Sequence, residues 1–119
     1  MGWEIEYTDE FEQWWFTLDE SLQETVAVSV GLLEELGVDL GFPRCSEIKN
    51  SKISHLRELR IQHKGDPYRV LYAFDPRRVG ILLIGGNKAG NDDWYEEYVP
   101  QAEKLYAVHI QTLKRERLI

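Results

Sequence analysis

Apolar residues recur along the chain with two different periods, and the change from one to the other marks out the predicted elements. Trp3, Ile5 and Tyr7 alternate with Glu4 and Glu6, the period of two that indicates a half-buried strand. From about residue 9 the apolar residues recur every three or four positions, which predicts helix. The chain is therefore expected to begin with a short strand and continue into helical sequence.

Two helices are predicted next, over 9–16 and from Thr17 to about residue 36. The first is rich in aromatic residues, which are expected to belong to the core rather than to a binding surface. Thr17 and Glu20 have the spacing of a capping box and are expected to open the second helix, while Gly37 is placed to end it in a left-handed conformation. The buried stripe of the second helix is expected to comprise Leu18, Leu22, Val26, Val30 and Leu33.

Three strand-like runs cover 57–62, 68–74 and 79–85. Short turns join them, which predicts an antiparallel meander. Alternation within the first two runs places Arg60 and Arg69 opposite the main apolar faces of their strands. The third run is almost entirely apolar, as in a strand that is buried on both faces.

The segments on either side of the meander are less regular. Residues 37–56 are predicted to form a loop, because Gly, Pro, Asn and Ser interrupt them, with room for a short helix around 46–50. After the meander, Asn91 or Asp92 is expected to cap a helical turn, and Pro100 suits the first position of the last helix. The apolar face of that helix is expected to comprise Ala102, Leu105, Tyr106, His109 and Leu113.

These elements predict an α+β fold in a single domain of residues 1–119. We expect a mainly antiparallel, twisted sheet of about four strands, with two N-terminal helices and a C-terminal helix packed on it. A chain of 119 residues is long enough for one hydrophobic core and too short for two comfortable ones.

Charge is distributed very unevenly along this fold. The formal net charge is −7, yet residues 1–43 contain eleven acids and no Lys or Arg, whereas residues 44–78 contain nine Lys or Arg and four acids. The basic segment coincides with the predicted meander, so we expect one surface of the sheet to meet a polyanion while the rest of the chain covers the other face. The basic residues of the stretch 55–94 are Arg57, Arg60, His63, Lys64, Arg69, Arg77, Arg78 and Lys88.

Several classes of location and chemistry are not expected. The only cysteine, Cys45, excludes an internal disulfide and fits a reducing cytosol. The acidic first residues do not resemble a secretory signal, and no apolar run approaches the roughly 20 residues of a membrane helix. We therefore expect a cytoplasmic protein without membrane association.

The sequence also lacks the motifs of nucleotide-binding and metal-binding sites. Gly85, Gly86 and Lys88 suggest a phosphate loop, but the glycine spacing is wrong and Ala89 stands where Ser or Thr is needed. The three histidines and Cys45 lack metal-ligand spacing. No metal and no cofactor are therefore expected.

The remaining Arg, Lys and Tyr residues suit phosphodiester cleavage without metal. When an RNA 2′-hydroxyl attacks the adjacent phosphate, fixed guanidinium and ammonium groups stabilise the charge that develops. A base and an acid are also needed, and each typically contributes about 10²–10⁴-fold to the rate. Tyr and Lys can serve only if nearby cations lower their pKa values, which is the effect expected of clustered Arg and Lys.

Four sequence phrases carry a family resemblance: LRELR, YRVLYAF followed by Asp-Pro, ILLIGGNKAG and DDWYEEYVPQAEKLY. With them, residues 3–112 resemble the phage-derived toxin family related to HigB, within the RelE/ParE superfamily of type II toxin–antitoxin systems. The resemblance implies a microbial RNase fold, an endoribonuclease that cleaves mRNA on the ribosome, and a cognate helix-turn-helix antitoxin as partner.

The resemblance also implies site residues. Arg69 matches the phosphate-binding arginine of the family, Lys88 matches the basic position that ends the next strand, and Tyr95 lies where superfamily members carry a catalytic tyrosine. Arg60 is added as a second group on the scissile phosphate, completing the expected catalytic set. The expected RNA-binding residues are Lys52, Arg57, His63 and Lys64.

Two other functions remain open at this point. The superfamily includes gyrase poisons without the RNase residues, so a ParE-like toxin with a protein target is one alternative. A non-catalytic binding domain of the same fold is the other. The identity of the general base and the oligomeric state are also open.

Overall fold

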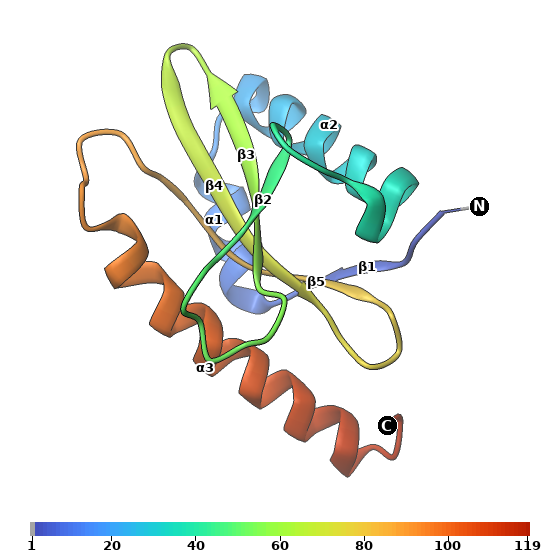
Figure 1. Ribbon diagram of the computed structural model, residues 1–119. Coiled ribbons are helices and arrows are strands. Elements are labelled where there is room, and N and C mark those ends of the chain that lie inside the picture. Colours follow the sequence, from blue (N-terminus) through green and yellow to red (C-terminus); the bar gives the residue numbers. More distant parts are fainter. Residues whose placement is uncertain (1) are drawn as a thin grey trace.

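A five-stranded sheet lies between helices in the computed structural model, which describes residues 2–119. Figure 1 shows α2 and α3 on opposite sides of this sheet. The fold is α+β, as predicted. Its elements are β1 (Ile5–Tyr7), α1 (Asp9–Thr17), α2 (Glu20–Leu36), the short 3₁₀ helix η1 (Gly37–Asp39), β2 (Cys45–Glu47), β3 (Arg57–His63), β4 (Asp66–Phe74), β5 (Gly80–Asn87) and α3 (Trp94–Arg115).

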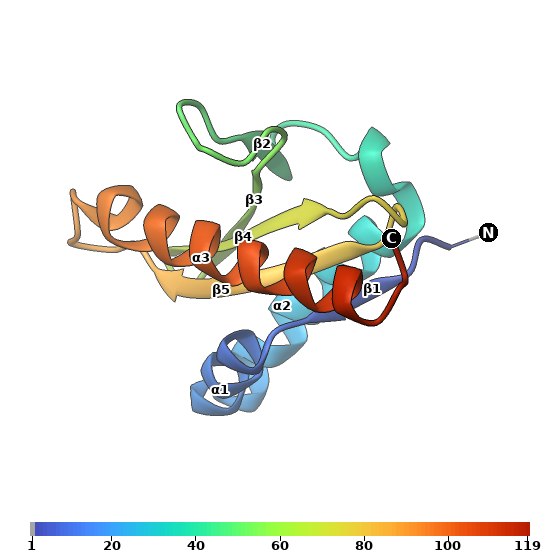
Figure 2. The same ribbon diagram turned by 90° about the horizontal axis from the view of Figure 1, so that it is seen from below.

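The strand order is β1-β5-β4-β3-β2. Strands β3, β4 and β5 form the predicted antiparallel meander, and β1 pairs in parallel with β5 at one edge of the sheet. Figure 2 shows α1 near the β1 edge and β2 at the opposite edge. The N-terminal strand and the meander are thus both confirmed.

The fifth strand, β2, was not predicted from the sequence. It pairs antiparallel with β3, with Cys45 opposite Leu59, so the expected loop and short helix around 46–50 are wrong at this point. Three residues carry too little periodic signal to identify a strand, and the hydrogen bonds that define β2 come from β3. The buried Cys45 side chain anchors it.

Each face of the sheet contributes to its own hydrophobic cluster. The cluster on the α1 and α2 side includes Phe11, Val26, Leu33, Leu59 and Val70. The cluster on the α3 side includes Leu71, Ala73, Leu83, Trp94 and Ala102. Helix α3 therefore covers much of the face that carries Arg60 and Arg69, and the expectation of an open basic sheet surface is wrong.

Two helix boundaries differ from the prediction. Asp19, rather than Thr17, caps α2, because its Oδ1 accepts a hydrogen bond from the Leu22 N–H at 2.8 Å, while the Thr17 hydroxyl donates to a carbonyl at the end of α1. Pro100 lies inside α3 instead of at its start. Proline removes one helical hydrogen bond, but Trp94 is fully buried and stacks on Tyr98 at 4.4 Å between ring centroids, so packing stabilises the turns before the proline. No helix within residues 2–119 has the length and apolar character needed to span a membrane.

Gly85 and Gly86 of β5 leave room for side chains that pack on the two faces of the sheet. A Cβ atom on Gly85 would lie 2.5 Å from the Trp14 ring on one face of the sheet, and a Cβ on Gly86 would lie 2.9 Å from Trp94 Nε1 on the other. Both separations are shorter than any normal contact. The two glycines therefore allow two tryptophans to approach the same strand from opposite sides.

Replacing Gly85 by Ala is expected to destabilise the protein by about 1–3 kcal/mol, because the added methyl group overpacks the contact with Trp14. Gly41→Ala is the matched control, since a Cβ at Gly41 meets nothing within 4 Å. Urea denaturation of both variants measures the difference. Equal stabilities would contradict this account of the glycine.

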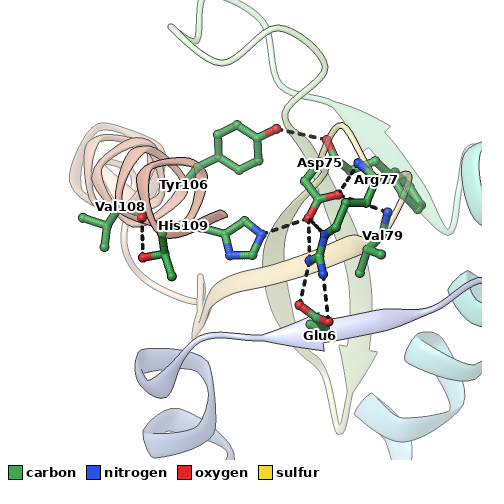
Figure 3. Close-up of polar contacts among 9 residues, drawn as sticks. Glu6, Asp75, Arg77, Val79, Tyr106, Val108 and His109 are labelled. Atoms are coloured by element: carbon green, nitrogen blue, oxygen red, sulfur yellow. Dashed lines mark hydrogen bonds and ion pairs between the residues drawn. The ribbon is translucent and has the colours of Figure 1, made fainter. Parts of the chain in front are cut away.

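Three segments that are distant in the sequence meet at the turn between β4 and β5. The Asp75 side chain is fully buried and lies 2.7 Å from Arg77 Nη2 and 2.9 Å from His109 Nε2 of α3. Arg77 also reaches Glu6 of β1 at 2.9 Å. Figure 3 shows these side chains converging on Asp75 and Arg77. We call this set, Glu6, Asp75, Arg77 and His109, the Asp75 clamp, because it ties β1 and α3 to the turn.

The Asp75 carboxylate is strongly held within the clamp. Burial alone would raise the pKa of this carboxyl, but hydrogen bonds from Arg77, His109 and the backbone N–H of Val79 together hold its pKa below the ordinary value. The carboxylate therefore stays ionised and also orders the turn, in which the Arg78 N–H donates to the Asp75 carbonyl at 2.8 Å.

Candidate functional site

A buried carboxylate lies at the centre of the candidate site. Glu58 of β3 is only 4% exposed. Its Oε1 accepts a hydrogen bond from the Tyr95 hydroxyl at 2.6 Å, and its Oε2 accepts one from the Ser46 hydroxyl at 2.5 Å. Arg60 Nη1 lies 3.3 Å from Oε2, and Arg69 Nε lies 3.4 Å from Oε1. The carboxylate thus joins side chains from β2, β3, β4 and α3.

Strand register explains why two arginines meet there. Arg60 and Arg69 are directly paired across β3 and β4, where two like charges repel. Glu58 precedes Arg60 by two residues on the same face of β3, so its negative charge lies diagonally across from Arg69 and offsets that repulsion. Arg69 is 7% exposed, and such a buried cation requires a compensating anion.

The Arg69 guanidinium has hydrogen-bonding capacity left over. Its Nη1 donates to the Tyr68 carbonyl at 3.0 Å. Its Nε is close to Glu58 but makes no hydrogen bond of proper geometry within the described residues. A buried donor without an acceptor is costly, and this atom is itself closed off from solvent, so its nearest anionic partner is Glu58 Oε1.

Tyr95 and Lys88 complete the cluster. The Lys88 ammonium lies over the Tyr95 ring, 5.5 Å from its centroid. Tyr95 lies in the first turn of α3, and the hydrogen bond from the Lys88 N–H to the Pro67 carbonyl fixes the loop before it. The structure therefore brings together all four residues of the predicted catalytic set, Arg60, Arg69, Lys88 and Tyr95.

The electrostatics of Tyr95 differ from the expectation. Burial, and then the hydrogen bond to Glu58, raise the pKa of Tyr95 above its ordinary value, and the opposing effect of Arg69 does not cancel them. The expected lowering of the Tyr95 pKa by neighbouring cations is wrong, because burial of the phenol and its hydrogen bond to Glu58 outweigh the effect of Arg69. Tyr95 is consequently a protonated phenol near neutral pH, suited to donate a proton.

The four predicted RNA-binding residues do not gather around this cluster. Arg57 and His63 point to the α2 side of the sheet: Arg57 Nη2 donates to the Cys45 sulfur, and His63 Nδ1 lies 2.8 Å from the Thr25 hydroxyl. Lys64 is exposed in the two-residue turn between β3 and β4, and Lys52 is exposed in the loop before β3. Arg77 and Arg78, at the far end of β4, are also separate, so the basic stretch does not form one continuous surface.

Glu58 and Ser46 are the site residues that sequence reasoning missed. Alternation places Glu58 on the same face as Arg60, and an acid between two arginines in LRELR was the available signal. Ser46 could not be found in this way, because it depends on β2.

Glu58 and Tyr95 open into a shallow pocket of about 360 Å³ that Glu47 of β2 and Glu96 of α3 also line. Arg60, Arg69 and Lys88 lie beside this pocket and do not line it. Fixed guanidinium groups, an ammonium group, a phenol and a carboxylate together supply charge stabilisation, a proton donor and a proton acceptor. That is the set needed to cleave a phosphodiester by acid–base catalysis. Within residues 2–119, no group of three or more His, Cys, Asp or Glu side chains is arranged to hold a metal ion.

Comparison of the sequence with known proteins gives a family and two relatives. Residues 13–107 match the family described as phage derived protein Gp49-like. The chain is 35% identical over 112 residues to HigB2 of Mycobacterium tuberculosis, described as a candidate toxin, in an alignment covering 92% of this chain and 55% of HigB2. It is 39% identical over 94 residues to HigB3 of the same organism, also described as a candidate toxin, covering 78% of this chain and 81% of HigB3. The chain thus spans about half the length of HigB2 and most of HigB3.

Solved structures show the same fold at low sequence identity. A mutant of Escherichia coli toxin RelE in the free state superposes with a TM-score of 0.56 and 11% identity, covering 81% of this chain and 94% of RelE. A chain of the RelE–RelB complex from Pyrococcus horikoshii gives a TM-score of 0.55 and 18% identity, covering 76% of this chain and 99% of that one. The architecture is therefore RelE-like.

Proposed function

This chain belongs to the Gp49-like family of phage-derived, HigB-type toxins in the RelE superfamily, and from that premise we propose that it cleaves mRNA on the ribosome. The proposed reaction is attack of a ribose 2′-hydroxyl on the adjacent phosphate without a metal ion. Its products are a 2′,3′-cyclic phosphate and a free 5′-hydroxyl. The toxin would act in the cytoplasm, where its substrate is.

One observation carries this proposal: a single buried carboxylate contacts both the phenol and the two arginines. The Tyr95 hydroxyl and Arg69 Nε both lie within 3.4 Å of Glu58 Oε1. This arrangement supports the proposal that a proton acceptor, a proton donor and a phosphate-binding cation act on one phosphodiester. Such pre-positioning removes much of the entropic cost of bringing reacting groups together.

Each residue has a distinct proposed role. The guanidinium groups of Arg69 and Arg60 bind the scissile phosphate, and Lys88 stabilises the negative charge that develops on it. Glu58 accepts the proton of the 2′-hydroxyl as the oxygen–phosphorus bond forms. Tyr95 donates its proton to the 5′-oxygen as the bond from phosphorus to that oxygen breaks. The Tyr95–Glu58 hydrogen bond then offers a route by which the proton returns to the phenol.

We propose a cognate antitoxin of helix-turn-helix type as the protein partner. The support is limited to family membership and to the similar archaeal chain, which was solved as a RelE–RelB complex. The predicted RNA contacts of Lys52 and Lys64 also remain part of this proposal, since both side chains are exposed. Arg57 and His63 are less suited to that role because they bond to groups on the α2 side.

Tyr95→Phe is expected to reduce the cleavage rate by about 10²–10⁴-fold, the usual contribution of a general acid. Tyr98→Phe is the matched control, because Tyr98 stacks on Trp94 through its ring alone. Single-turnover cleavage of an mRNA bound to purified ribosomes measures both variants. If Tyr95→Phe cleaved as fast as the wild type, the assignment of Tyr95 as the acid would be excluded.

Induced expression in a bacterial host tests the function as a whole. Growth arrest together with new 5′-hydroxyl mRNA ends within minutes is the expected result. Inhibited DNA supercoiling without new mRNA ends would identify a ParE-like action instead. Unaltered growth in the presence of abundant soluble protein would refute the toxin activity.

A further inference from the structure

A second concave feature lies on the other side of the sheet from the Glu58 cluster. It is a groove of about 390 Å³ between β1, α1 and α2, and we call it the β1–α2 groove. Its floor and walls are largely apolar, with Ile5 from β1, Trp15 from α1 and Val30 from α2. No part of the described chain fills it.

Two large aromatic side chains stand exposed beside this groove. Phe16 is 73% exposed and Tyr7 is 58% exposed, and both line it. Exposed aromatic residues at a concave apolar site are typical of protein–protein contacts, where they become anchors once covered. The proposed cleavage reaction uses none of these residues.

The charge around the groove is of one sign. Residues 1–43, which build β1, α1 and α2, contain eleven acids and no Lys or Arg. Glu12 and Glu34 line the groove itself, and neither forms an ion pair within residues 2–119. An apolar cleft with uncompensated carboxylates at its rim complements a segment that carries apolar side chains between Lys or Arg residues.

We infer that the β1–α2 groove is where the antitoxin binds, through a short apolar and basic segment. This inference rests on the proposed toxin function for the identity of the partner and on the groove for its chemistry. Apolar side chains of the segment enter between Trp15 and Val30, and its cations pair with Glu12 and Glu34. Because the groove and the Glu58 cluster lie on opposite faces of the sheet, this segment does not occupy the catalytic pocket.

Adjacent residues of α2 supply a matched pair of variants for the test. Glu34 lines the groove, whereas Glu35 is exposed and does not. Glu34→Lys and Glu35→Lys change the net charge equally and involve neighbouring positions on one helix. The probe is the antitoxin proposed above, taken from the reading frame adjacent to that of this chain and purified separately.

Titration calorimetry is expected to show at least tenfold weaker binding of this probe to Glu34→Lys than to Glu35→Lys. The wild-type affinity should fall as salt is raised, and Glu34→Lys should reduce that dependence. Phe16→Ala should also weaken binding by tenfold or more without change of net charge. Equal affinities of the two lysine variants, with Phe16→Ala unaffected, would overturn the groove as the binding site.

Growth assays separate a failure of this inference from a failure of the proposed function. Glu34→Lys should still arrest growth when expressed alone, but co-expressed probe should no longer rescue it, whereas Glu35→Lys should be rescued. If rescue were equal for both variants, the groove inference would fail while the toxin activity stood. If expression of the wild type did not arrest growth, the proposed toxin activity would be refuted. The calorimetric comparison would still show whether the probe binds in the β1–α2 groove.

Discussion

Replacing Arg69 by Ala is expected to reduce mRNA cleavage by at least 10²–10³-fold, the scale seen when one fixed donor is removed from a developing oxyanion. The same change should also lower stability, because Glu58 loses a partner in a buried ion pair whose side chains are 8% and 5% exposed. Breaking such a pair costs about 3 kcal/mol. A simple surface arginine would carry no such stability cost, so the two effects must be measured separately.

Single-turnover cleavage at a temperature where the variant remains folded isolates the chemical effect. Arg69→Lys should recover much of the stability by restoring a cation beside Glu58, yet remain a poor catalyst, because an ammonium group cannot reproduce the guanidinium fork. Lys104→Ala, an exposed change on α3, should leave both quantities unchanged. Full activity of folded Arg69→Ala would remove Arg69 from the phosphate site.

The second large effect concerns the Asp75 clamp. Asp75→Asn keeps the size of the side chain but removes the charge that pairs with Arg77 and His109, both of which are themselves largely buried at this point. We expect a loss of about 3 kcal/mol, or roughly 10 °C in melting temperature for a domain of this size. Asp75 directly follows β4 and lies six residues from Arg69, about 20 Å at strand spacing, so the cleavage rate of the folded variant should not change.

The contribution of Asp75 also has a defined pH dependence. Because the folded-state pKa is held below its ordinary value of 3.8, the clamp stabilises the protein fully above that value. Its contribution is lost as pH falls through the lower folded-state pKa. Denaturation curves at pH 7, 5 and 3 should therefore show wild type and Asp75→Asn converging at low pH. A constant difference between them down to pH 3 would contradict the ionised clamp.

Side-chain alternation in the strands was sufficient to place Arg60 and Arg69 on one face of the sheet. A period of two determines the face of each residue wherever one face is apolar, so the sequence alone assigns Arg60 and Arg69 to one side of the sheet. The expectation that all the basic residues of the strands share one surface was wrong, because it considered their charge and not the face on which each lies. Arg57 and His63 lie on the opposite face, and an even spread of basic residues along strands does not make one surface.

The features that the sequence did not predict depend on contacts between distant segments. Strand β2 exists because β3 offers it hydrogen bonds, and Pro100 stays inside α3 because Trp94 and Tyr98 hold the turns before it. The raised pKa of Tyr95 follows from its burial and from a carboxylate 37 positions away in the sequence. Local propensity carries no information about such partners.

The parallel pairing of β1 with β5 has a consequence for the order in which this protein folds during synthesis. Ile5 lies opposite Gly80, so the first strand has no partner until most of the chain has been synthesised, and its long-range pairing must form late. The Glu58 cluster likewise cannot assemble until Tyr95 has been synthesised. A nascent chain that has not yet reached Tyr95 therefore lacks the assembled Glu58 cluster on which the proposed cleavage depends.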